Sequence, residues 1–89
     1  DAALRLRSGD STILDSRGFA YLKLGLLGRA IADFDAALRA DPRLASSRYL
    51  RGIARLRMGD RAGAKADIDA ALALKPDIAA EFRRYGITR

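Results

Sequence analysis

The sequence predicts an all-α fold built from repeated pairs of helices. Residues 11–44 align with residues 45–78 without a gap, and thirteen positions are identical at a spacing of 34 residues. Within each copy, apolar residues recur at helical spacing, and Gly or Pro follows each predicted helix. A fixed period of this length indicates a repeat architecture, in which each unit buries its apolar face against a neighbour.

The 89 residues are expected to form one domain with four parts. In chain order these are the end of a preceding unit, two whole units and the start of a third, at residues 1–10, 11–44, 45–78 and 79–89. The first part is assigned because the sequence Asp1–Leu4 recurs at Asp35–Leu38. The chain lacks an initiating Met and starts within the repeat pattern, so we expect a fragment of a longer protein.

Turn and capping residues define two helices in the first whole unit. Ser11 and Thr12 are expected to cap a helix that reaches about Leu24. A glycine that can adopt left-handed backbone geometry follows this helix. The second helix is expected at residues 27–40 and ends before Pro42, because the residue before proline is displaced from helical geometry.

The second unit repeats this pattern. Its helices are expected at residues 44–58 and 61–74, and Asp60 is suited to cap the second of them. A last helix at about residues 78–85 opens the third unit. Gly86 follows it at the place that a helix-interior glycine occupies in each whole unit.

Small and apolar residues at fixed places predict how the helices pack. Small residues should lie where the helix backbones approach closely, at Gly18, Gly52, Ala30, Ala64, Ala37 and Ala71. Apolar residues at helical spacing should fill the core. These are Leu24, Ile31, Phe34, Leu38, Ile53, Leu56, Ile68 and Leu72.

Two charged pairs also recur with the period. Arg17 and Asp33 lie on the two helices of the first unit, and Arg51 and Asp67 lie at the same places in the second. We expect each pair to form a partly buried ion pair between helices, with a structural rather than a catalytic role.

The period and these residues resemble the tetratricopeptide repeat, a helix–turn–helix unit with small residues at fixed places and a proline near its end. The resemblance covers essentially the whole chain and rests on the Arg-Gly, Ala-x-x-Asp-Phe/Ile-x-x-Ala-Leu and Asp/Lys-Pro signals, each present twice. Leu14 and Arg48 stand where the family often has a large aromatic residue, and Arg55 replaces the tyrosine found at Tyr21. The resemblance implies a right-handed superhelical stack of antiparallel helix pairs, an α-solenoid.

The composition argues against catalysis in this segment. The chain has no Cys and no His, which removes the usual nucleophile–base pairs and the commonest metal ligands. Asp33 and Asp35 lie two residues apart on a helix and point in different directions, so they do not form an acid–base dyad. We therefore expect no enzymatic activity, no cofactor and no metal site.

No apolar run approaches the roughly 18 residues that span a membrane, so a soluble protein is expected. The cytoplasm is favoured and the periplasm is left open. Because Arg far outnumbers Lys, the composition also favours a bacterial source with a GC-rich genome.

Binding is the function that remains, and stacked helical repeats form an extended concave surface for it. The resemblance implies that the first helix of each unit lines this groove. The groove residues are then Asp15, Phe19, Lys23, Tyr49, Leu50, Ile53, Arg57, Arg83 and Arg84. An apolar floor with a basic rim suits a protein or peptide with apolar anchors and acidic flanks, because Arg can bind carboxylates through two hydrogen bonds. The module is thus expected to be a protein-interaction scaffold.

The sequence also leaves two alternative functions open. A net charge of +6 and an isoelectric point near 10.5 favour nucleic-acid binding, with Arg48, Arg51 and Arg55 on one helix face. Against it, no nucleic-acid motif is present and aromatic residues do not alternate with the basic ones. The second alternative is structural self-assembly, because half units at both ends would present apolar faces to another copy.

Overall fold

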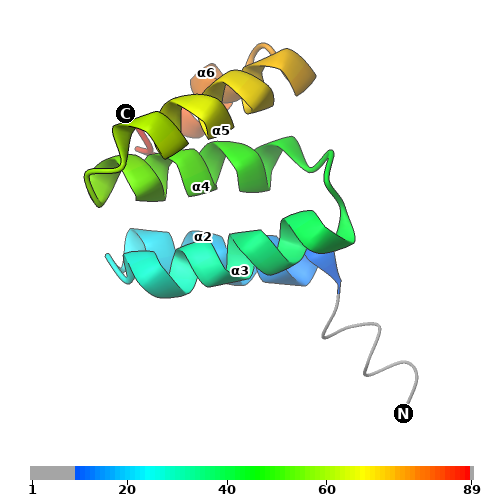
Figure 1. Cartoon of the computed structure of the whole chain (residues 1–89), viewed down its shortest axis with the longest axis vertical. Coiled ribbons are helices and arrows are strands. Elements are labelled where there is room, and N and C mark those ends of the chain that lie inside the picture. The colour runs from blue at the N-terminus through cyan, green and yellow to red at the C-terminus, as the bar shows by residue number, and fades with distance from the viewer. Residues whose placement is uncertain (1–9, 89) are drawn as a thin grey trace.

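The computed structural model describes residues 10–88, and this part of the chain contains five α-helices and no strand (Figure 1). The helices are α2 (Ser11–Lys23), α3 (Leu27–Ala40), α4 (Ala45–Arg57), α5 (Arg61–Leu74) and α6 (Ile78–Arg83). The all-α fold class is confirmed. The predicted helices at residues 27–40 and 61–74 have the observed bounds, and the other three differ by one or two residues at an end. The half unit expected at residues 1–10 lies outside the described residues, apart from Asp10.

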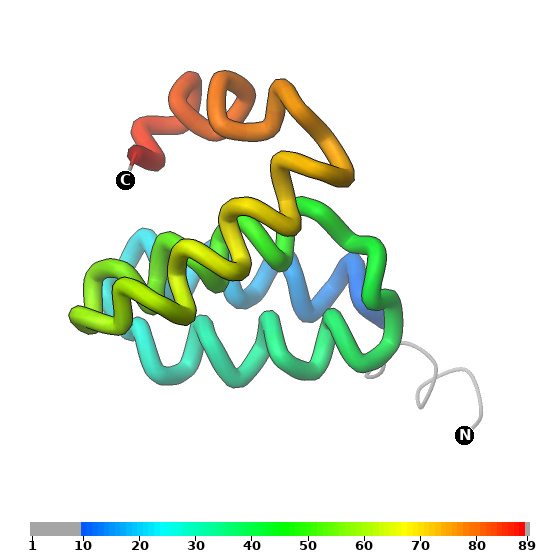
Figure 2. Tube along the Cα trace, turned by 45° about the horizontal axis from the view of Figure 1, so that its top comes forward, coloured from blue at the N-terminus to red at the C-terminus, as the bar shows by residue number. Residues whose placement is uncertain are grey.

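The helices form two antiparallel pairs that stack on each other (Figures 1 and 2). Helix α2 packs along α3, and α4 packs along α5. Helix α4 also packs on α3 of the preceding pair and contacts both α2 and α6. It is therefore the central element, and it joins the two whole units to the beginning of the third.

Two aspartates cap helix N-termini. The carboxylate of Asp10 accepts a hydrogen bond from the Thr12 backbone N–H at 2.8 Å, and that of Asp60 accepts one from Gly63 at 2.9 Å. Asp60 was predicted for this role. The prediction that Ser11 and Thr12 cap α2 is wrong by one position, because Asp10 takes the cap and Ser11 is already helical.

Helix α6 is shorter than predicted because the chain reverses at Gly86. This glycine has φ 78°, and the N–H of Ile87 donates to the Phe82 carbonyl at 3.1 Å. The pattern is the same glycine stop that ends α2 and α4. It directs Ile87, which is 5 % exposed, back into the core beside Phe82. The described part of the third unit is therefore a short helix followed by a reversed segment.

The predicted core is largely confirmed. Phe34, Leu38, Ile53 and Ile68 are buried, and three further predicted core residues are partly buried. Those three are Ile31, Leu56 and Leu72. Leu24 is wrong: it is 73 % exposed, because α2 ends at Lys23 and Leu24 lies in the turn that follows.

The repeated glycines inside the first helices do permit close helix packing. A Cβ atom added at Gly18 would lie 2.6 Å from the ring of Phe34. A Cβ atom at Gly52 would lie 2.7 Å from Cγ1 of Ile68 and 3.1 Å from the backbone oxygen of Ala64. The distances of 2.6 and 2.7 Å are too short for a real side chain, so each unit needs glycine where its two helices cross.

Candidate protein-interaction surface

The predicted groove residues lie on α2, α4 and α6, the first helices of successive units. Three aromatic side chains of these helices meet there with Tyr85, which follows α6. We call Phe19, Tyr49, Phe82 and Tyr85 the aromatic cluster. The ring of Phe82 stacks on Tyr49 with 5.6 Å between centroids and meets the ring of Phe19 edge-on at 5.7 Å. The centroid of the Tyr85 ring lies 6.2 Å from the ring centroids of both Phe19 and Phe82. Such geometries stabilise aromatic pairs beyond the effect of burial alone.

The expected open apolar floor is not exposed. Tyr49 is 1 % exposed, and Leu50 and Ile53 are fully buried. Phe82 of α6 covers Tyr49, so the C-terminal segment occupies the space in which these side chains were expected to meet a ligand. Phe19 is partly buried, and Tyr85 at 64 % exposed remains accessible.

Phe82 and Tyr85 were missed as members of this surface. A signal for Phe82 was available, because it lies 34 residues after Arg48, at the place where the family often carries a large aromatic residue. The third unit therefore supplies the aromatic residue that both whole units lack. No comparable signal marks Tyr85, which stands at the place of Arg17 and Arg51.

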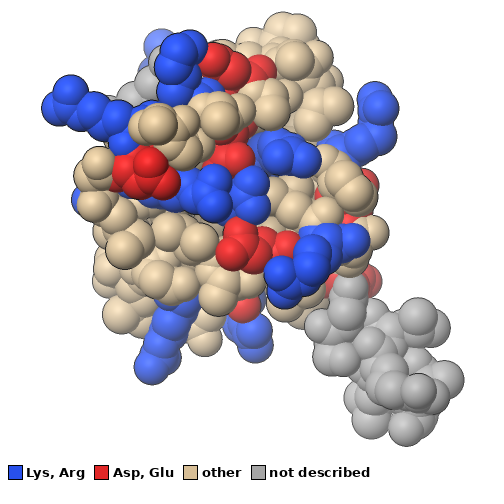
Figure 3. Space-filling view, viewed as in Figure 1, with Lys and Arg blue, Asp and Glu red and all other residues tan. Residues whose placement is uncertain are grey.

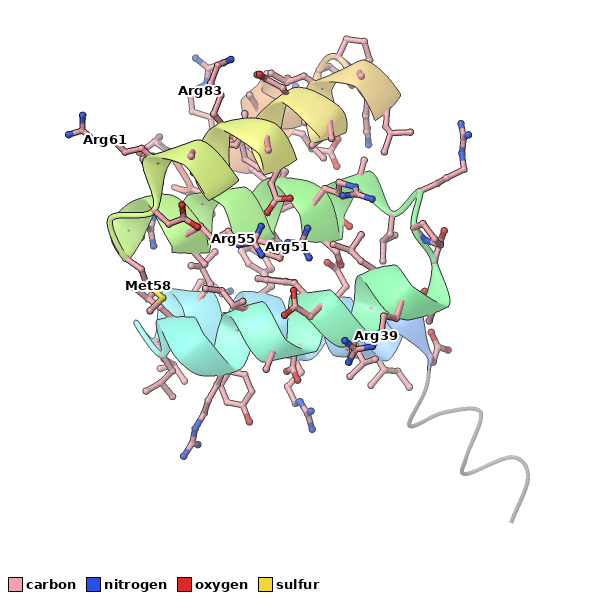
Figure 4. The ribbon with its side chains drawn as sticks, viewed as in Figure 1. Arg39, Arg51, Arg55, Met58, Arg61 and Arg83 are labelled. Carbon is pink, nitrogen blue, oxygen red and sulfur yellow. The ribbon has the colours of Figure 1, made fainter. Side chains whose placement is uncertain are left out.

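A small cavity lies between α4 and the C-terminal segment. Its volume is about 230 Å³, and it is lined by Tyr49, Ala79, Arg83, Ile87 and Thr88. Arg83 is exposed, and Figure 4 shows its guanidinium pointing away from the body of the molecule. The cavity is thus a mostly apolar notch with an exposed cation at its edge.

Four exposed basic side chains lie on or next to the helices that supply the aromatic cluster. The Lys23 ammonium lies 4.6 Å from the centroid of the Phe19 ring, a cation–π contact. Arg57, Arg83 and Arg84 are exposed, and none of these four forms an ion pair within residues 10–88. We call Lys23, Arg57, Arg83 and Arg84 the basic rim.

Asp15, the one acidic residue predicted in the groove, is engaged inside the chain. Its carboxylate accepts hydrogen bonds from the hydroxyls of Ser47 at 2.7 Å and Ser46 at 3.1 Å. These contacts join α2 to α4, and Ser47 is fully buried. Asp15 therefore holds neighbouring units together.

The two predicted ion pairs are confirmed. Arg17 donates two hydrogen bonds of 2.8 Å to Asp33, and Arg51 donates bonds of 2.8 and 2.7 Å to Asp67. The hydrogen bond to Asp67 is the main cause of a raised Arg51 pKa, so this guanidinium stays charged. Both pairs join the two helices of one unit.

A contact between units was not predicted. Arg51 also donates to Asp35 of the preceding unit at 2.8 Å, so its guanidinium bridges two carboxylates 16 residues away on either side. Arg55 donates to Asp67 at 2.9 Å. Figures 3 and 4 show this arrangement, with Arg51 and Arg55 between the helix layers and acidic side chains adjoining basic ones.

These pairings bear on the arginine stripe of α4 that favoured nucleic-acid binding. Arg51 and Arg55 are neutralised by carboxylates, and Arg48 donates to the backbone oxygen of Pro42 at 3.2 Å. The stripe thus holds the units together, and the main argument for a nucleic-acid surface on α4 is lost.

Comparison with protein families agrees with this architecture. The profile of the tetratricopeptide repeat matches residues 12–44 and 45–78, which together make up more than half of the chain. The chain belongs to the tetratricopeptide repeat family. Repeats of this family generally mediate protein–protein interaction. No curated protein sequence matches the chain.

Two further features are absent from the described residues. None of the helices between residues 10 and 88 is both long and apolar enough to cross a membrane. In the same part of the chain, no group of three or more acidic side chains is placed to hold a metal ion.

Proposed function

We propose that this segment acts without catalysis and binds an acidic segment of a partner protein on the surface formed by α2, α4 and α6. The observation that carries the proposal is the contrast between two sets of cations. Arg17, Arg51 and Arg55 are bound to carboxylates between helices. The basic rim has no such partner within residues 10–88, and its Lys23 contacts the Phe19 ring of the aromatic cluster.

The chemistry of this surface favours acidic and apolar groups together. Arginine side chains bind carboxylates through paired hydrogen bonds, and these bonds are stronger than those between neutral groups. Phe19 and Tyr85 offer partly exposed aromatic surface beside the cations. A ligand with one apolar anchor and flanking Asp or Glu residues would satisfy both features.

The C-terminal segment restricts how deeply such a ligand can bind. With α6 in place, a ligand reaches Phe19, Tyr85 and the basic rim. Contact with Tyr49 requires that Phe82 move away, since the two rings are stacked. Binding at the rim and displacement of α6 are therefore separable steps.

A selection from a random peptide library displayed on phage tests the proposal. We expect peptides rich in Asp and Glu with a conserved apolar position. In the double variant Lys23→Glu/Arg57→Glu, affinity for the selected peptides should fall by about tenfold or more, because attraction becomes repulsion. The matched control is Arg39→Glu/Arg43→Glu, which makes the same charge change at exposed residues of α3 and the following turn.

The control should retain affinity within about twofold, because charge at a distance is screened at physiological salt. Equal losses in both double variants would mean that net charge alone drives binding and would reject the site. Selection of neutral peptides would reject the acidic ligand. Tight binding of a single-stranded oligonucleotide, with an affinity that falls steeply with salt, would instead favour the nucleic-acid alternative.

A further inference from the structure

A second groove lies between α4 and α5, and it shares no lining residue with the basic rim or the aromatic cluster. Its volume is about 320 Å³. We call it the end-face groove, and its lining residues are Leu56, Arg61, Ala64, Lys65, Ile68 and Asp69. Figure 4 shows Arg61 pointing outward near the beginning of α5.

The first unit contains the equivalent surface, and there it is covered by a helix. Shifting the lining residues back by 34 positions gives Leu22, Leu27, Ala30, Ile31, Phe34 and Asp35. Helix α4 packs along α3 in this region, and Arg51 of α4 binds Asp35 at 2.8 Å. Leu22 is 1 % exposed, whereas Leu56, its equivalent, is partly exposed. The protein therefore shows within itself what occupies a surface of this kind.

The end-face groove is open because α6 is short. Helix α4 has 13 residues, but α6 has 6 and is followed by the reversal at Gly86. Within residues 10–88, the part of the α4–α5 surface that a full-length helix would cover is thus left open. The space corresponds to about two helical turns, or about 10 Å of helix.

The charges of the end-face groove differ from those of the equivalent surface in the first unit. Arg61 and Lys65, both exposed, replace Leu27 and Ile31. Asp69 stands at the place of Asp35, but its only ion-pair partner within residues 10–88 is Lys65, one turn away on the same helix. The groove thus has an apolar floor, two exposed cations and one carboxylate that would have to exchange its exposed Lys65 partner for an arginine.

We propose that the end-face groove binds an acidic amphipathic helix of another protein, seated on α5 as α4 is seated on α3. Such a helix would place an Arg on Asp69, small or aliphatic residues on Leu56 and Ile68, and carboxylates against Arg61 and Lys65. Helix α4 begins five residues after α3 ends and packs back along it, so the two run antiparallel. The carboxylates therefore belong one to two turns C-terminal to the Arg.

A second copy of this chain fits less well. The helix it would present, α2, contains a single acidic residue, Asp15, which is already bound to Ser46 and Ser47. Its Arg17 stands at the place of Arg51 and would meet Asp69. However, Tyr21 and Leu24 stand where the proposed helix carries carboxylates, so Lys65 and Arg61 would meet no acidic side chain. Charge complementarity thus selects an acidic helix over head-to-tail assembly.

The probe is a synthetic peptide with the sequence of residues 45–58 that carries Arg55→Glu, Arg57→Glu and Met58→Glu, so that it holds two arginines and three glutamates. The glutamates at positions 55 and 58 lie opposite Lys65 and Arg61. In a two-dimensional amide NMR titration, we expect shifts concentrated at the end-face groove. Arg61→Glu/Lys65→Glu in the protein should weaken binding by about tenfold or more. The unmodified peptide of residues 45–58 has the same Arg51 and apolar residues but carries only positive charge. It should bind about tenfold more weakly than the probe.

A charge exchange makes the test specific. Asp69→Arg in the protein should abolish binding of the probe, and Arg51→Asp in the probe should restore it to that variant. The Arg39→Glu/Arg43→Glu protein is the control and should bind the probe as the unchanged chain does. Absence of shifts on α5 at millimolar probe, or equal binding by all variants, would overturn the proposal and leave the polar residues as a solubilising end of the repeat stack. Because the basic rim is not involved, either result is independent of the function proposed above.

Discussion

Asp67 joins the helices of the second unit, and its replacement by Asn tests how the stack is held together. The carboxylate is 4 % exposed and accepts three hydrogen bonds of 2.7–2.9 Å from Arg51 and Arg55. Removing one partner of a buried ion pair typically costs about 3–5 kcal/mol, since the other charge is left without compensation. Arg51 keeps its bond to Asp35, so we expect a loss near the lower end, about 3 kcal/mol.

Asp33 provides an internal comparison at the same place of the preceding unit. Its partner Arg17 has a side chain 59 % exposed, compared with 15 % for Arg51. When Asp33 is replaced by Asn, the Arg17 guanidinium can turn into water, so the cost should be distinctly smaller. The same substitution should thus have unequal effects at two repeat-equivalent positions.

The measurement is the free energy of unfolding from urea titrations followed by circular dichroism. The double variant Asp67→Asn/Arg51→Met should recover part of the stability that Asp67→Asn loses, because the more deeply buried guanidinium is removed and Arg55, whose side chain is 29 % exposed, can turn toward water. Equal losses for Asp33→Asn and Asp67→Asn would refute the reasoning, and so would a double variant that is less stable than Asp67→Asn alone.

Three further predictions concern packing and the C-terminal segment. Gly52→Ala should destabilise by about 1–3 kcal/mol, since the added methyl meets the Ala64 backbone; unchanged urea stability would contradict the observed helix spacing. Gly28→Ala should raise stability by about 0.5 kcal/mol, because this exposed helical glycine has no atom within 4 Å of the added Cβ; destabilisation would show a contact that the structure lacks. Phe82→Ala should release α6 and expose Tyr49, seen as faster hydrogen exchange after residue 77 with α2–α5 still protected, whereas exchange unchanged throughout would mean that the stacked rings do not hold the segment.

Much of the fold could be predicted because its signals are local and recur. The glycine and proline stops belong to single turns, and the bounds of α3 and α5 follow from them. The ion pairs within units were visible because Arg17/Asp33 recurs as Arg51/Asp67. The bridge from Arg51 to Asp35 was not visible, because its repeat equivalent would need an Arg at residue 85, where Tyr85 stands.

The exposed surface was harder to predict because it depends on long-range packing. Gly52 and Gly86 occupy the same repeat place, yet one is helical and the other has φ 78°. Helix α5 packs tightly over Gly52, whereas a Cβ added at Gly86 would meet nothing within 4 Å in the described structure. Without such packing the chain turns, and Phe82 and Ile87 cover side chains that periodicity alone places on an open groove. The prediction that Leu24 lies in the core was wrong for a local reason. A one-residue shift of a helix end moves a side chain from the core to solvent.

The most direct test of the proposed binding surface is an amide NMR titration of the chain with an acidic peptide obtained by display selection. The account predicts that shift changes concentrate at Phe19, Lys23, Arg57 and Arg83, and that they disappear in the Lys23→Glu/Arg57→Glu variant. Shift changes centred on Arg39 and Arg43, or unchanged binding in that variant, would contradict it.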